Sequence, residues 1–126
     1  MLSSYLLQAT PHRGLQAQNC NGEWIDCPPI QGTLVVALGQ GMESITQGIC
    51  TSTTHRVNSP DAGLGPRFSV AFFQGVGLDA RFEAMNVPQE LRRELVRGKK
   101  PSDVEFTFTR DAGFSCLGEA ILMNRV

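Results

Sequence analysis

Short apolar segments separated by Gly, Pro, Asn and Asp run through most of this sequence, a pattern typical of many short strands and not of a helical fold. Residues 32–39, GTLVVALG, form a continuous apolar run framed by glycines, as in a strand buried on both faces. Residues 67–76, RFSVAFFQGV, form a second such run. Residues 103–109, DVEFTFT, alternate apolar and polar side chains, which predicts a half-buried strand. The pattern therefore predicts an all-β sandwich or jelly roll.

One segment near the C-terminus has the pattern of a short helix. Residues 87–101 read VPQELRRELVRGKKP, with Leu91 and Leu95 four residues apart. Pro88 suits the first helical turn, and Gly98 suits the end of a helix. We therefore expect a single β domain that carries a short C-terminal helix.

Composition and charge exclude several classes of partner. Eleven Lys and Arg against twelve Asp and Glu give a formal net charge of −1, with no basic stripe that would follow a phosphate backbone. No apolar stretch is long enough to cross a bilayer, the N-terminus lacks the basic region of a signal peptide, and the four cysteines form no C-x-x-C pair. We therefore expect a soluble, cytoplasmic protein with reduced thiols that binds neither nucleic acid nor membrane.

Two neighbouring segments, STTHRV and RFSV, carry the candidate site residues. If STTHRV is a strand, His55 lies on the face opposite Arg56, and its imidazole is a common ligand of transition metals. In the next predicted strand, Arg67 and Ser69 are two residues apart and share a face. A guanidinium beside a hydroxyl is a good receptor for a carboxylate. The residues alone leave other roles open, a structural hydrogen-bonded histidine for His55 and a surface ion pair for Arg67.

The order of these motifs resembles a known family. Residues 22–48, GEWIDCPPIQGTLVVALGQGMESITQG, followed by STTHRV and PRFSVAFF, are similar to the C-terminal part of the isopenicillin N synthase-like, 2-oxoglutarate and Fe(II)-dependent dioxygenases, particularly the fungal members. The similarity is close over residues 5–75. It implies that residues 1–80 are the C-terminal part of the dioxygenase barrel, and that residues 81–126 are an extension with the helix and a closing strand.

The resemblance implies a fold and a chemistry. The fold is a partial double-stranded β-helix, in which iron is held by two histidines and one carboxylate. His55 matches the distal histidine of that set, and Arg67 and Ser69 match the pair that binds the far carboxylate of 2-oxoglutarate. Decarboxylation of 2-oxoglutarate to succinate and CO₂ then accompanies hydroxylation, desaturation or ring closure of a small organic substrate, which the sequence does not identify.

The sequence also departs from the family pattern. The family's H-x-D ligands are absent from residues 1–5, and His12 does not replace them because it lies in a predicted turn. We therefore expect a truncated chain that is inactive alone and binds Fe(II) weakly, with an exposed strand edge that favours self-association. Whether this chain is itself an enzyme stays open. The alternative is a noncatalytic β-sandwich that binds a small carboxylate or a protein partner.

Overall fold

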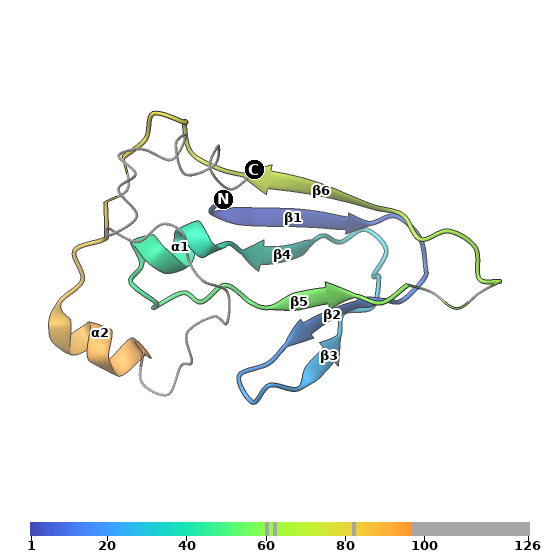
Figure 1. The fold of residues 1–126 in the computed structure, drawn as a ribbon, viewed down its shortest axis with the longest axis horizontal. Coiled ribbons are helices and arrows are strands. Elements are labelled where there is room, and N and C mark those ends of the chain that lie inside the picture. The colour runs from blue at the N-terminus through green and yellow to red at the C-terminus, as the bar shows by residue number, and fades with distance from the viewer. Residues whose placement is uncertain (60, 62, 82, 97–126) are drawn as a thin grey trace, which may run out of the picture.

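The computed structural model describes residues 1–59, 61, 63–81 and 83–96, so the strand predicted at residues 103–109 lies outside the described part. This part is mainly β-structure, as expected (Figure 1). Its helices are α1 (Gln40–Ile45) and α2 (Gln89–Val96). Its strands are β1 (Ser3–Gln8), β2 (Leu15–Gln18), β3 (Trp24–Asp26), β4 (Val35–Leu38), β5 (His55–Val57) and β6 (Ser69–Gln74).

The strands form two small antiparallel sheets. In the first sheet β1 lies between β4 and β6, and in the second sheet β2 lies between β3 and β5. Figure 1 shows that the chain passes repeatedly from one sheet to the other, because β4 and β6 join the first sheet while the intervening β5 joins the second. His55 and Ser69, which begin β5 and β6, therefore stand on different sheets.

One face of the first sheet, which we call the inner face, is directed toward the second sheet. On β1 it carries Ser4, Leu6 and Gln8, since alternate residues of a strand share a face. The side chain of Gln8 donates from Nε2 to the carbonyl oxygen of Cys27, just after β3, at 3.0 Å. Directly opposite partners share a face, so the inner face also carries the following residues of β4 and β6: Val35, Ala37, Ser69, Ala71 and Phe73.

The second sheet has one apolar and one polar face. Leu15 pairs with Val57, and Ala17 pairs with His55, so these side chains share the apolar face. Leu15 is 4% exposed and is the buried hydrophobic residue of the described part. The other face carries Gln16 and the residues that pair with it. His55 therefore projects to the side opposite its neighbour in sequence, Arg56, as the alternation in STTHRV predicts.

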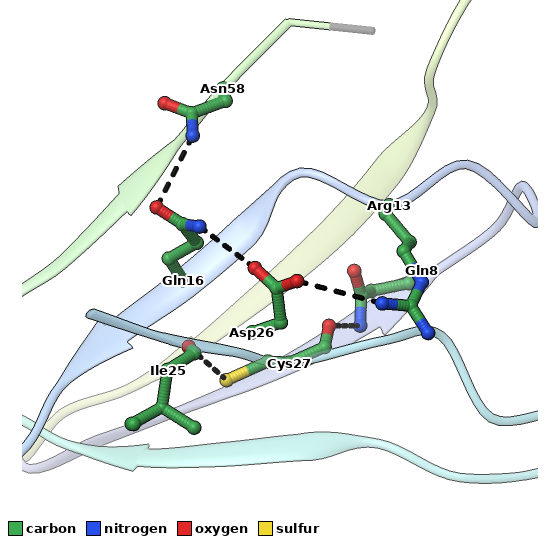
Figure 2. Close-up of polar contacts among 7 residues, drawn as sticks. All are labelled: Gln8, Arg13, Gln16, Ile25, Asp26, Cys27 and Asn58. Atoms are coloured by element: carbon green, nitrogen blue, oxygen red, sulfur yellow. Dashed lines mark hydrogen bonds and ion pairs between the residues drawn. The ribbon is translucent and has the colours of Figure 1, made fainter.

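The polar face of the second sheet holds a chain of contacts around Gln16. Its Nε2 donates to Asp26 Oδ1 at 2.8 Å, and its Oε1 accepts from Arg56 Nε at 2.8 Å and from Asn58 at 3.2 Å. Arg13 reaches the other oxygen of Asp26 at 3.5 Å (Figure 2). The Arg56 guanidinium also lies 4.1 Å from the ring centre of Trp24. Arg56 is exposed, and its side chain lies on this polar face, away from the apolar face that carries His55.

Large apolar side chains remain uncovered on the outer face of the first sheet. Tyr5 and Phe72 are direct partners there, with ring centroids 6.1 Å apart. Phe72 is nevertheless 65% exposed and Val36 60% exposed. The prediction that residues 32–39 form a strand buried on both faces is therefore wrong for the described structure. The strand covers Val35–Leu38 at a sheet edge, and no described element packs on its outer face.

The helix predicted near the C-terminus is present. α2 begins directly after Pro88, whose carbonyl accepts the first hydrogen bond from Arg92 N at 2.9 Å. Gly98 and the rest of the extension lie outside the described residues. Within the described residues, no helix is long and apolar enough to cross a membrane.

Candidate functional site

His55 presents one ring nitrogen as a free donor atom for a ligand. Its Nδ1 lies 3.0 Å from the carbonyl oxygen of Thr53. A carbonyl only accepts hydrogen bonds, so in the neutral ring Nδ1 carries the proton and Nε2 keeps its lone pair. Histidines that bind metals through one nitrogen commonly donate the other N–H to a backbone carbonyl in this way. The local backbone therefore prepares His55 for coordination through Nε2.

The exposed side of His55 borders a cavity of about 270 Å³. Two of its wall residues, Ser4 and Ala37, belong to the inner face of the first sheet. The cavity thus lies where the two sheets approach, with His55 on the wall from the second sheet. The wall residues are Met1, Ser4, Ala37, Leu38, Gly39, Gln40, Ser52, Thr53, Thr54 and His55.

Arg67 contacts Gln8, a residue of the inner face, and retains most of its donors. Its Nη2 donates to Oε1 of Gln8 at 3.0 Å, and its Nε is buried with no hydrogen-bond partner among the described residues. The side chain is half-buried, and no described carboxylate forms an ion pair with it. The surface ion pair that the residues alone allowed for Arg67 is therefore not found in this part of the chain.

Ser69 begins β6, two residues after Arg67. It is the direct partner of Gln8 in the β1–β6 ladder, so it shares the inner face with Gln8. Ser69 is exposed, and its hydroxyl forms no hydrogen bond within the described residues. Gln8 thus links the two residues, because it accepts from Arg67 and pairs with Ser69. Joint binding of a carboxylate by Arg67 and Ser69 stays a prediction.

Gly14 lets the loop after β1 approach Arg67. Its φ of +150° is one that glycine adopts readily, and its carbonyl accepts from Asn58 N at 2.9 Å. A Cβ at this position would collide with the Asn58 carbonyl oxygen and come within 3.4 Å of Arg67 Nε. The absence of a side chain at position 14 thus leaves room for the guanidinium.

The described residues offer one candidate metal ligand and no complete metal site. No group of three or more His, Cys, Asp or Glu is arranged to hold a metal ion there. His12 lies in the loop between β1 and β2, outside the cavity wall that contains His55. His55 thus fits as a single ligand of iron, and a facial set of three requires two more donors.

Gln8 contacts the predicted anchor Arg67 directly, but nothing in the sequence around Gln8 indicates this contact. The two residues are 59 positions apart in the chain. A glutamine at the end of an apolar segment has no distinctive pattern, and only the pairing of β1 with β6 reveals its neighbour. Phe72 and Phe73, in contrast, separate onto opposite faces, so only Phe73 shares the inner face with Ser69.

Comparison with protein families gives a match that covers all six described strands. The family model described as the 2OG-Fe(II) oxygenase superfamily matches residues 1–76. The 2-oxoglutarate-dependent dioxygenase frbJ of Dothideomycetidae sp. (strain 11243) is 61% identical over 131 residues, which covers 100% of this chain and 35% of that protein. 1-Aminocyclopropane-1-carboxylate oxidase 4 of Arabidopsis thaliana is 37% identical over 103 residues, which covers 82% of this chain and 31% of that protein. The chain thus spans about a third of the length of these curated relatives.

Solved structures give the same picture of the fold. A full-length Neurospora crassa protein in complex with alpha-KG superimposes with a TM-score of 0.69 at 23% identity, over 98% of this chain and 34% of that one. The dioxygenase for auxin oxidation 1 from Arabidopsis thaliana, in a 2-oxoglutarate complex, has a TM-score of 0.63 at 25% identity, over 71% of this chain and 34% of that one. The arrangement of the two sheets is therefore that of a portion of these larger folds.

Proposed function

Because this chain belongs to the 2OG-Fe(II) oxygenase superfamily, we propose that it carries the 2-oxoglutarate anchor and one iron ligand of a dioxygenase that hydroxylates or desaturates a small organic substrate. The two sheets are then a partial double-stranded β-helix formed by residues 1–80, with residues 81–126 as an extension. The end of the family match at residue 76 supports this division.

Arg67 and Ser69 bind the far carboxylate of 2-oxoglutarate in this proposal. The guanidinium fork can donate to both oxygens of a carboxylate, and the Ser69 hydroxyl adds a further donor. A buried donor without a partner costs about 1–3 kcal/mol. The buried Nε of Arg67 is such a donor. A carboxylate that reaches Nε after a rearrangement of the site would remove this cost. The half-buried guanidinium, with no described carboxylate to neutralise it, is the observation that carries the proposal.

His55 holds iron through Nε2, with the Thr53 carbonyl fixing the proton on Nδ1. Iron, when bound, supplies the redox chemistry that couples decarboxylation of 2-oxoglutarate to oxidation of the substrate. In this proposal one carboxylate of the co-substrate pairs with Arg67, which leaves its 2-oxo acid end free for the iron that His55 would hold. A facial iron site needs two further ligands, and no group of three or more His, Cys, Asp or Glu in the described part of the chain is arranged to hold a metal ion.

Calorimetric titration of the purified chain with 2-oxoglutarate, with and without Mn(II) as a redox-stable substitute for Fe(II), tests the proposal. We expect the acid to bind, and Mn(II) held by His55 to strengthen its binding. Absence of any binding would contradict the anchor assignment.

A second candidate function is a noncatalytic module that binds a small carboxylate. The lack of a three-ligand cluster among the described residues favours it. The same titration, repeated with His55→Ala, separates the two functions. A dioxygenase portion predicts that any effect of Mn(II) on acid binding is lost in His55→Ala, whereas a noncatalytic module binds the acid with an affinity that depends neither on Mn(II) nor on His55. A protein partner in place of the acid would leave the titration without heat.

Self-association through a strand edge is also proposed. β6 lies at an edge of the first sheet, and its Val70 is 61% exposed. An unpaired strand edge with apolar side chains can pair with a second copy. Light scattering after size-exclusion chromatography is expected to give more than the monomer mass, and a monomer at all concentrations would refute this part.

A further inference from the structure

The side-chain amide of Gln8 connects the anchor arginine to the second sheet. Its Nε2 donates to the Cys27 carbonyl oxygen at 3.0 Å (Figure 2), and its Oε1 accepts from Arg67 Nη2 at 3.0 Å. A carbonyl oxygen can only accept and a guanidinium can only donate. The orientation of the amide is therefore determined by its two partners, and the two contacts depend on each other.

We propose that Gln8 is a positioning residue that holds the Arg67 guanidinium in the orientation needed to bind the dicarboxylate. The inference rests on the proposed function and deepens it, because it assigns a role to a side chain outside the Arg67 and Ser69 pair. Gln8 is the direct ladder partner of Ser69. Gln8 and Ser69 therefore share one end of the inner face, and Arg67 contacts Gln8 there.

The neutral charge of Gln8 matters to this role. An arginine side chain has about 2 kcal/mol of rotamer entropy, so a contact that orders it before the ligand arrives reduces the cost of binding. A carboxylate at position 8 would also order Arg67, but it would neutralise the guanidinium and repel the incoming acid. An amide orders the cation and leaves its charge for the ligand.

Gln16, on the polar face of the second sheet, supplies a matched control. Gln16 is also a strand glutamine, and its Oε1 accepts from Arg56 Nε at 2.8 Å. This contact has the same chemistry as the one between Gln8 and Arg67, but it lies on the polar face away from the inner face. Loss of the Gln16 side chain should therefore leave co-substrate binding unchanged.

Calorimetric titration of the full 126-residue chain with 2-oxoglutarate, in the wild type and in Gln8→Ala, Gln8→Glu, Gln16→Ala and Arg67→Ala, tests the inference. Loss of one charge-assisted hydrogen bond predicts a Kd raised about tenfold in Gln8→Ala. Gln8→Glu should bind 2-oxoglutarate more weakly still, with a Kd about a hundredfold above that of the wild type, because it also introduces a competing carboxylate. Gln16→Ala should match the wild type.

Nitrogen relaxation of the Arg67 side chain separates positioning from a merely structural role. If Gln8 only stabilised the fold, a folded Gln8→Ala chain would keep the same Arg67 side-chain order as the wild type. Positioning predicts a change in the motion of Arg67. We expect its guanidinium to rotate faster in Gln8→Ala and to remain ordered in Gln8→Glu. A Gln8→Ala guanidinium as ordered as the wild type would overturn the inference.

The outcomes also distinguish failure of the inference from failure of the proposed function. If the wild type binds 2-oxoglutarate, Arg67→Ala does not, and both Gln8 variants bind as the wild type does, the anchor stands and only the Gln8 role is overturned. If the wild type does not bind, the anchor assignment fails and the inference fails with it. Thermal unfolding of each variant confirms that the chains compared are folded.

Discussion

Ala17 and His55 are direct partners in the β2–β5 ladder, and this pairing places the imidazole on the same face of the second sheet as the buried Leu15. The contact of His55 Nδ1 with the Thr53 carbonyl then determines which nitrogen is available. His55 also borders the cavity that Ser4 and Ala37 of the first sheet line, and Nε2 is the ring nitrogen that the Thr53 contact leaves available.

The first prediction concerns metal binding by His55. A single imidazole binds a divalent metal weakly, so we expect a small addition of Mn(II) to broaden the ring signals of His55 in the NMR spectrum selectively. Signals of His12, in the loop between β1 and β2, should change less, and this histidine is the matched control. Equal broadening of both rings would show that His55 has no special affinity.

A second prediction tests the space that Gly14 leaves for Arg67. Alanine there would collide with the Asn58 carbonyl, so Gly14→Ala should lower the free energy of unfolding by about 2–3 kcal/mol and also weaken 2-oxoglutarate binding. Urea denaturation measures the first effect and calorimetry the second.

Gly32 is the control for that prediction. Its φ of +78° also favours glycine, but a Cβ would meet no atom within 4 Å. Gly32→Ala should therefore lower the free energy of unfolding by about 1 kcal/mol, from backbone strain alone, and leave 2-oxoglutarate binding unchanged. Equal effects of the two substitutions on stability and binding would contradict the steric explanation.

The third prediction concerns the core. Leu15 is 4% exposed, so Leu15→Ala should lower the free energy of unfolding by about 2–3 kcal/mol. Val36 is 60% exposed on the outer face of the first sheet, so Val36→Ala should lower the free energy of unfolding by less than about 0.5 kcal/mol. The same urea experiment compares them. A larger loss at Val36 than at Leu15 would mean that the outer face is covered in solution.

Local patterns were sufficient to predict several elements and the faces of their residues. Pro88 and the leucines that follow it predicted α2, and alternation in STTHRV predicted that His55 and Arg56 point to opposite sides. These properties depend on residues close together in sequence, for which helical and strand periodicity is a direct guide.

Properties that depend on distant pairing could not be predicted in this way. The run around Val36 has the composition of a doubly buried strand, but β4 lies at a sheet edge with no described element on its outer side. The contact between Gln8 and Arg67 joins residues 59 positions apart and depends on the register of β1 with β6. No local pattern contains that register.

The most direct test of the central claim compares the affinity for 2-oxoglutarate of Arg67→Ala with that of the wild type. Arg56→Ala is the matched control, because Arg56 is a neighbouring arginine held by Gln16 and Trp24 on the polar face of the second sheet. We predict a Kd raised about a hundredfold in Arg67→Ala and unchanged in Arg56→Ala, as expected for loss of a charge-assisted contact to a carboxylate. Equal affinity of Arg67→Ala and the wild type for 2-oxoglutarate would contradict the account.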